Sequence, residues 1–192
     1  DIGAYGGGSA LHLAAALPGA RVTAVELDPV MVALARCLLA FAGVSQRVTL
    51  LPGHTRLRLP QLRGRRFTAA FADVWGSQYA EVLDMLREQE LLSAGAVLVA
   101  DNVLRTAAAE FAWRVTAPNG GFRSLVVPVS EVANPDEEDW MTVSVMDECG
   151  SAHAPVPEEL KELQARSENL RSSATNDGIA PEEHRDFSLH AK

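Results

Sequence analysis

The chain has 192 residues, a formal net charge of −8 and a hydrophobic fraction of 47%. This length allows one α/β domain and a tail. The negative charge argues against a general nucleic-acid binder, which would have to neutralise phosphates. No apolar run reaches the roughly 18 residues of a membrane span. Two cysteines are too few for a disulfide framework. We therefore expect a monomer of the reducing cytosol, with no membrane contact in this segment.

The first residues form a glycine-rich turn with no strand in front of it. We interpret the chain as a fragment that begins near the end of its first strand. Its N-terminal part, and any targeting segment, would then lie outside it.

Apolar runs alternate with helical patterns after this turn. The expected strands are Val22–Val25, Val48–Leu51, Phe67–Ala72 and Ala96–Ala100. The expected helices are Ser9–Leu17, Pro29–Ala42, Gln78–Leu91 and Thr106–Val115. Asp28 suits the N-cap of the second helix, Pro29 its first position and Gly43 its C-terminal cap. Strands that are apolar throughout and separated by helices predict a doubly wound, mostly parallel α/β sheet.

The pattern changes after Gly121. Phe122–Val127 and Trp140–Met146 read as two strands joined by an acidic loop, without room for a crossover helix. They predict an antiparallel hairpin at the sheet edge. From Glu148 the chain turns polar, and only Glu158–Ser172 is expected to form an isolated helix. The predicted organisation is a domain over residues 1–148 and a polar, disordered tail over 149–192.

The glycine loop Asp1-Ile2-Gly3-Ala4-Tyr5-Gly6-Gly7-Gly8-Ser9 suits close approach of the backbone to a ligand. It is not a Gly-x-Gly-x-x-Gly fingerprint, because Tyr5 takes the place of the second glycine. Glu26 ends the next strand, where a carboxylate can accept both hydroxyls of a ribose, in S-adenosylmethionine (SAM) as in NAD. The alternative is a tight turn with a solvated acid. Gly53 and Thr55 follow the expected strand Val48–Leu51, where small polar groups could meet the edge of an adenine ring. His12 and His54 receive no functional role.

Acidic and amide side chains end two further strands. Asp73 follows the expected strand Phe67–Ala72, and the pair Asp101-Asn102 follows the expected strand Ala96–Ala100. Ligands of open parallel sheets bind outside the carboxyl ends of the strands, so these side chains should converge near the glycine loop. Two carboxylates and one amide oxygen suit Mg²⁺ and leave positions for water and substrate. The alternative for Asp101-Asn102 alone is a turn signal.

With its glycine loop, Glu26, and Asp73, Asp101 and Asn102 at the strand ends, the chain resembles the catechol O-methyltransferase family. The resemblance runs from Asp1 to about Met146. The matching stretches are Ile2–Tyr5, Ser9-Ala10, Glu26 with Pro29, Phe41–Val44, Val48–Leu50, Pro60–Leu62 and Ala100–Val103.

The resemblance implies a seven-stranded Rossmann-like SAM methyltransferase fold, SAM and Mg²⁺ as cofactors, and a small diphenol as substrate. The cofactor residues it implies are Asp1, Gly3, Tyr5, Ser9, Glu26, Gly53, Thr55, Asp73 and Trp75. The metal ligands would be Asp73, Asp101 and Asn102. Asp73 and Asn102 would also serve catalysis, with Glu131 contacting a substrate hydroxyl. The alternative for Glu131 is one more acid in an acidic loop.

The chain departs from the family at the general base. The family carries a lysine three residues after the first metal aspartate, where this chain has Gly76. Its lysines, Lys161 and Lys192, both lie in the tail. The metal alone could acidify the substrate, a base could come from the missing N-terminal part, or strong turnover could be lost. The family's glutamine at the adenine is Arg56 here. Arg56 belongs to an arginine cluster that we interpret as a solvated helix face.

Four functions follow in order. The first is Mg²⁺- and SAM-dependent methylation of a catechol or similar vicinal diphenol. The second is the same chemistry on another acceptor, such as a phenylpropanoid. The third is a SAM-binding protein with weak or no catalysis. A NAD-dependent dehydrogenase comes last, because the loop and the terminal hairpin disfavour it.

Overall fold

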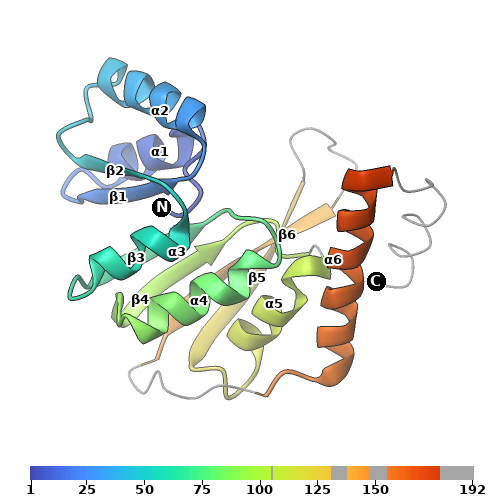
Figure 1. Cartoon of the computed structure of the whole chain (residues 1–192). Coiled ribbons are helices and arrows are strands. Elements are labelled where there is room, and N and C mark those ends of the chain that lie inside the picture. The colour runs from blue at the N-terminus through green and yellow to red at the C-terminus, as the bar shows by residue number, and fades with distance from the viewer. Residues whose placement is uncertain (105, 131–137, 148–154, 178–192) are drawn as a thin grey trace.

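The computed structural model describes residues 1–104, 106–130, 138–147 and 155–177 (Figure 1). The elements in chain order are α1 (Gly8–Ala16), β1 (Val22–Glu26), α2 (Pro29–Phe41), β2 (Val48–Pro52), α3 (Thr55–Arg58), η1 (Pro60–Leu62), β3 (Phe67–Ala72), α4 (Gln78–Glu88), β4 (Leu92–Ala100), η2 (Thr106–Ala108), α5 (Ala109–Thr116), β5 (Phe122–Ser130), β6 (Glu138–Met146) and α6 (Glu158–Asp177). Within the described residues, no helix is long and apolar enough to cross a membrane.

The strands form two groups that Ile2 connects. β1 pairs with β2 in parallel, and the second group has the order β3-β4-β6-β5. Ile2 forms parallel bridges to Val25 of β1 and to Ala72 of β3. It therefore occupies the place of a strand between the two groups. The predicted α/β fold, with a mostly parallel, doubly wound sheet, is confirmed, and β3 is neighbour to both Ile2 and β4, as the metal-site hypothesis requires.

The last two strands form the antiparallel hairpin that the sequence predicts. β5 pairs with β6 from Phe122↔Met146 to Ser130↔Glu138, and β6 also pairs antiparallel with β4. The chain thus places its final strand inside the sheet and leaves β5 at the edge. β5 and β6 begin or end two to three residues beyond their predicted limits.

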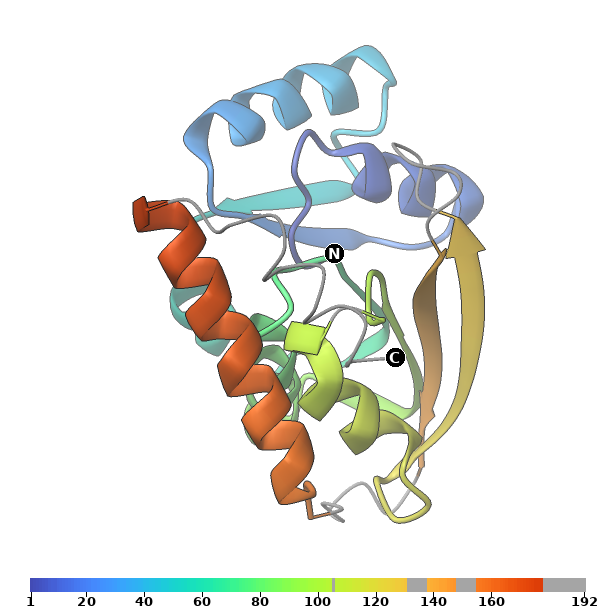
Figure 2. The ribbon, with the colours of Figure 1, turned by 90° about the vertical axis from the view of Figure 1, so that its right-hand side faces the viewer.

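Helices cover the two groups of strands differently. Figure 2 shows α1 and α2 together over β1 and β2, and α4 and α5 on one face of the larger group. In the part of the chain that the structure describes, no helix covers the other face of the larger group. A row of apolar side chains crosses that face, in the register Phe71, Val99, Val143 and Leu125, and Leu125 is 63% exposed.

Local signals account for most helix limits. The Asp28 side chain accepts hydrogen bonds from the N–H groups of Val30 (2.7 Å) and Met31 (3.4 Å), as expected of an N-cap. Gly43 ends α2 with a positive φ of 72°. α4 ends at Glu88, before the predicted Leu91, because Glu90 takes the left-handed conformation (φ 50°) that turns the chain into β4.

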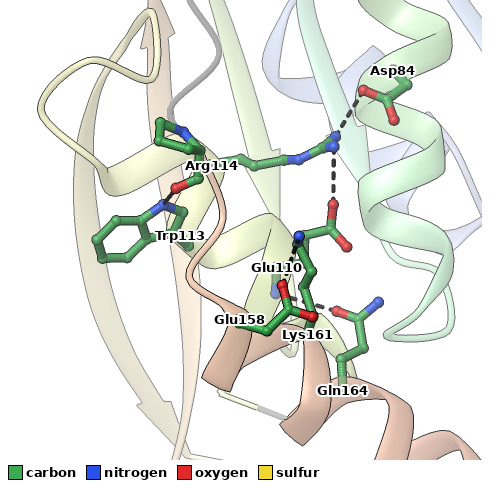
Figure 3. A network of polar contacts seen from close by, with 8 residues as sticks. Asp84, Glu110, Trp113, Arg114, Glu158, Lys161 and Gln164 are labelled. Carbon is green, nitrogen blue, oxygen red and sulfur yellow. Dashed lines mark hydrogen bonds and ion pairs between the residues drawn. The ribbon is translucent and has the colours of Figure 1, made fainter.

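α6 packs against the domain and is not the isolated helix that the polar composition predicted. It contacts η2 and α5. The Gln164 side chain accepts a hydrogen bond from the N–H of Glu110 (3.2 Å), and the Trp113 indole donates to the carbonyl of Pro155 (3.0 Å) (Figure 3). Arg114 of α5 bridges Glu110 (2.9 Å) and Asp84 of α4 (2.7 Å). Helices α4, α5 and α6 are thus connected, while the boundary of the tail at residue 149 stays a prediction.

Candidate functional site

The glycine loop passes so close to its neighbours that two positions exclude a side chain. A Cβ on Gly3 would lie 1.9 Å from the carbonyl oxygen of Asp73, and one on Gly7 would lie 2.9 Å from the Cβ of Ala35. Both glycines also have positive φ, 87° and 86°. Gly3 and Gly7 therefore stand where the end of β3 and α2 leave no room for a side chain and the backbone has a positive φ.

Tyr5 and Glu26 fix the shape of the loop. Tyr5 has a φ of 46°, which a non-glycine residue adopts only where the surroundings enforce it. Its N–H donates to Oε2 of Glu26 (2.6 Å), and the N–H of Asp28 donates to Oε1 (2.7 Å). Glu26 is 9% exposed, so its carboxylate is held rigidly at the end of β1. Each oxygen retains a second lone pair for a ligand hydroxyl.

Asp1 and Ser9 meet across the start of the loop. The Ser9 hydroxyl donates to Oδ2 of Asp1 at 2.8 Å. The other carboxylate oxygen of Asp1, Oδ1, is buried and has no hydrogen-bond partner among the described residues. A buried carboxylate oxygen without a donor is costly, so this position suits a ligand that brings an N–H or ammonium group.

A cavity of about 640 Å³ opens beside the loop. Its lining includes Gly3, Tyr5, Ser9 and, from the end of β3, Asp73. His12 also lines it, one helical turn after Ser9 on α1. The structure thus brings three residues predicted for the cofactor, and Asp73, which was predicted for both cofactor and metal, to the same cavity. The other residues predicted for the cofactor are not part of its lining: Asp1, Glu26, Gly53, Thr55 and Trp75.

The residues predicted for the adenine lie where β2 ends. The N–H of Gly53 donates to the carbonyl of Glu26 (2.7 Å), and the next turn starts α3 with Thr55 buried. Arg56, which replaces a family glutamine, forms an ion pair with Glu81 of α4 and turns away from that role. Trp75 is 62% exposed, in the turn after β3. The adenine contacts themselves stay predictions.

Asp73, Asp101 and Asn102 lie at the ends of the neighbouring strands β3 and β4. The N–H of Asp73 donates to the carbonyl of Ile2 (2.9 Å), and the N–H of Asp101 donates to the carbonyl of Ala72 (3.0 Å). These hydrogen bonds hold the ends of β3 and β4 next to each other. Asn102 has a φ of 52°. Within the described residues, no three His, Cys, Asp or Glu side chains gather as ligands of one ion. A metal site here would therefore depend on the amide of Asn102 as its third ligand.

Asp139 of β6 is a polar residue of this region that the sequence did not single out. It is 4% exposed, and its Oδ2 accepts a hydrogen bond from Nδ2 of Asn102 (3.0 Å). Its Oδ1 accepts from the N–H groups of Trp140 (2.7 Å) and Leu104 (3.3 Å). Asp139 is one of three buried polar residues of β6, with Thr142 and Ser144, and no motif in the sequence distinguishes it from the acidic loop before it.

Tyr79 joins the turns that follow β3 and β4. Its hydroxyl donates to the carbonyl of Asp101 and accepts from the N–H of Val74 (3.3 Å). Burial raises the pKa of this hydroxyl, and nearby carboxylates add to the rise. Tyr79 therefore keeps its proton, and its two hydrogen bonds link the backbone after β3 to the backbone after β4, next to the candidate metal ligands.

Gly76 lies against η2. A Cβ at this position would be 2.6 Å from the Cβ of Ala107 and 2.9 Å from its carbonyl carbon. The space that a side chain at position 76 would need is therefore filled by η2. Glu131, predicted to contact a substrate hydroxyl, lies outside the described residues.

The comparisons with known proteins agree on one family. Residues 1–118 match the family described as O-methyltransferase. Catechol O-methyltransferase of Sus scrofa is 37% identical over 116 residues, which cover 58% of this chain and 62% of that protein. The Bos taurus protein is 35% identical over 116 residues, which cover 58% of this chain and 43% of its own length. The chain thus spans about half the length of these relatives.

Solved structures share the fold. An O-methyltransferase from Bacillus cereus in complex with SAH superposes with a TM-score of 0.64 at 20% identity, covering 76% of this chain and 72% of that chain. The O-methyltransferase TomG from Streptomyces achromogenes, in complex with SAM, has a TM-score of 0.61 at 24% identity, with coverages of 76% and 71%.

Proposed function

This chain belongs to the O-methyltransferase family, and on that premise we propose that it transfers the methyl group of SAM to a hydroxyl of a catechol or similar vicinal diphenol, with the help of a bound Mg²⁺. Relatives named catechol O-methyltransferase, at 35–37% identity, support this choice of acceptor. A cytosolic setting is part of the proposal, consistent with the exposed free thiol of Cys37.

The observation that carries the SAM part is the buried Oδ1 of Asp1, which has no hydrogen-bond partner among the described residues, while Oδ2 of the same carboxylate accepts from Ser9 of the cavity lining. SAM presents an α-ammonium group, which would satisfy this oxygen. Glu26 would accept the ribose hydroxyls with the lone pairs that its two backbone donors leave free. Gly3 keeps the loop open for the methionine part, because any side chain there would collide with β3.

The residues at the ends of β3 and β4 suit the metal part. Asp73, Asp101 and Asn102 would supply oxygen ligands, which Mg²⁺ prefers. When bound, SAM supplies the methyl group, and Mg²⁺ lowers the pKa of the acceptor hydroxyl and orients it. Asp73 lines the same cavity as Ser9, so the acceptor oxygen and the methyl donor would be held on adjoining walls.

The acceptor hydroxyl must lose its proton during methyl transfer. We infer that the metal acidifies the acceptor without a lysine, because position 76 has no room for one beside Ala107. General-base catalysis is typically worth about 10² to 10⁴ in rate, so turnover should be slow near neutral pH and rise with pH. A base from a segment before Asp1 is the alternative.

The same crowding supports a second candidate, a SAM-binding protein of this family with weak or no catalysis. The two functions separate in one experiment. Protein that includes any preceding residues is incubated with labelled SAM and a diphenol, first with Mg²⁺ and then with EDTA. Methyl transfer that stops with EDTA supports the enzyme. Methyl transfer at the same rate with EDTA would reject the metal role of Asp73, Asp101 and Asn102. SAM binding without methyl transfer would support the second candidate.

A further inference from the structure

We propose that Asp139 is a positioning residue: it sets the orientation of the Asn102 side-chain amide and so decides which atom of that amide faces the cation. The inference rests on the Mg²⁺ site of the proposed function. It concerns a buried acid of β6 that the sequence motifs leave unexplained.

Three hydrogen bonds of Asp139 divide between its two oxygens. Oδ1 accepts hydrogen bonds from the backbone N–H groups of Trp140 (2.7 Å) and Leu104 (3.3 Å). Oδ2 accepts Nδ2 of Asn102 at 3.0 Å. Because Asp139 is 4% exposed, water has little access to replace these donors. The carboxylate is thus held by β6 and by the segment after β4, and it presents one oxygen to Asn102.

The backbone of Asn102 is fixed independently. Its φ is 52°, and its N–H donates to Oδ1 of Asp101 at 2.9 Å. The main remaining freedom is a half-turn of the amide, which exchanges Oδ1 and Nδ2. A carboxylate offers only acceptors, so a turned amide would place oxygen against oxygen. Asp139 therefore holds the Nδ2 end and leaves Oδ1, the only atom of this amide that can bind Mg²⁺, turned away from it.

Asp139→Asn tests this geometry because the new side chain can keep these three hydrogen bonds. The two backbone N–H groups need an acceptor, so the new amide keeps its oxygen with them and turns its NH₂ toward Asn102. Asn102 must then turn its own oxygen toward position 139. Its NH₂ consequently faces the cation, and the metal loses a ligand while these three hydrogen bonds are kept.

A second substitution restores an oxygen. In the Asp139→Asn background, Asn102→Asp supplies a carboxylate that accepts from the new NH₂ with one oxygen and leaves the other for the cation. Glu138→Gln is the matched control, because it removes the same charge from the adjacent, exposed residue of β6. Its hydrogen bond from the Trp140 indole (2.8 Å) can be kept by the amide oxygen.

The measurement is Mn²⁺ binding to the full chain, followed by electron paramagnetic resonance, with SAH binding and the thermal midpoint as controls. Asp139→Asn should weaken Mn²⁺ binding by about 10- to 100-fold, the usual effect of losing a partner of a metal ligand. Glu138→Gln should leave it within about threefold, and the double variant should recover most of the loss. SAH binding should be unchanged in all three.

Equal Mn²⁺ affinity in Asp139→Asn and the wild type would overturn the inference, as would a double variant no better than the single one. Absence of Mn²⁺ binding by the wild type would instead reject the metal part of the proposed function, and this inference with it. If Asp139→Asn does not fold, the wild type still decides. The NH₂ protons of Asn102 should exchange slowly with solvent by NMR, with and without Mg²⁺, and rapid exchange contradicts the proposal.

Discussion

Gly76→Ala should destabilise the protein, although it adds a single methyl group to a turn. The new Cβ would lie 2.6 Å from the Cβ of Ala107, whereas carbon atoms in contact are normally about 3.5 to 4.0 Å apart. η2 would have to move by about 1 Å, and α6 packs on η2 from outside. Overpacking of this kind costs about 1 to 3 kcal/mol, so we expect a loss of about 2 kcal/mol in the free energy of unfolding.

Urea denaturation of Gly76→Ala and of two companion variants measures this loss. Gly19→Ala is the matched control, because a Cβ there meets nothing within 4 Å. It should be neutral or slightly stabilising, since alanine restricts the unfolded chain. Ala107→Gly in the Gly76→Ala background removes the colliding atom and should recover about half of the loss, a coupling that distant sites do not show. A Gly76→Ala protein as stable as Gly19→Ala would refute the reasoning.

The close approach of position 76 to Ala107 also affects whether a lysine at position 76 could act as the general base. Gly76→Lys meets Ala107 through its first side-chain carbon, so this substitution alone should bring no gain in kcat. The fair test is Gly76→Lys combined with Ala107→Gly, assayed as a pH–rate profile of methyl transfer. A gain near neutral pH in the combined variant only would identify η2 as the obstacle. A gain from Gly76→Lys alone would show that η2 yields easily.

Three further substitutions address the loop and the helices. Glu26→Ala should weaken SAH binding about 10- to 100-fold by calorimetry, because hydrogen bonds to a charged group are worth about 1.5 to 3 kcal/mol; a change below about threefold would contradict the role of Glu26. Gly7→Ala should cost about 2 to 4 kcal/mol in urea denaturation, since it combines a left-handed conformation with a collision at Ala35; a loss under about 1 kcal/mol would speak against that packing. Arg114→Ala should cost about 1 kcal/mol by removing two ion pairs, and the loss should shrink in 1 M NaCl; a loss that salt does not change would point to lost packing instead.

Local and periodic signals were enough to predict most of the fold. Apolar runs located the strands within a few residues, and the cap at Asp28 is confirmed by its hydrogen bonds. The antiparallel hairpin followed from the lack of a crossover helix between β5 and β6. Because parallel strands share one carboxyl edge, the neighbourhood of Asp73 and Asp101 could also be predicted from the order of the elements.

Contacts between distant segments with no signal of their own could not be predicted. Asp139 is 37 residues from Asn102, and nothing in the acidic stretch around it marks which acid enters the sheet. Gly76 looked like a lost lysine, while its contact with Ala107 depends on a three-residue turn of η2. α6 packs on η2 and α5 and uses single hydrogen bonds such as that of Gln164, which its polar composition does not predict.

Ile2 has a consequence for how a ligand would couple the two groups of strands. The group of β1 and β2 and the group of β3 to β6 meet at Ile2, which forms bridges to Val25 and Ala72. The glycine loop leads into α1 beside the first group, Asp73 follows β3 of the second, and residues of both line one cavity. SAM bound there, as proposed, would contact both groups at once. Amide hydrogen exchange should then slow in both groups together when the ligand binds.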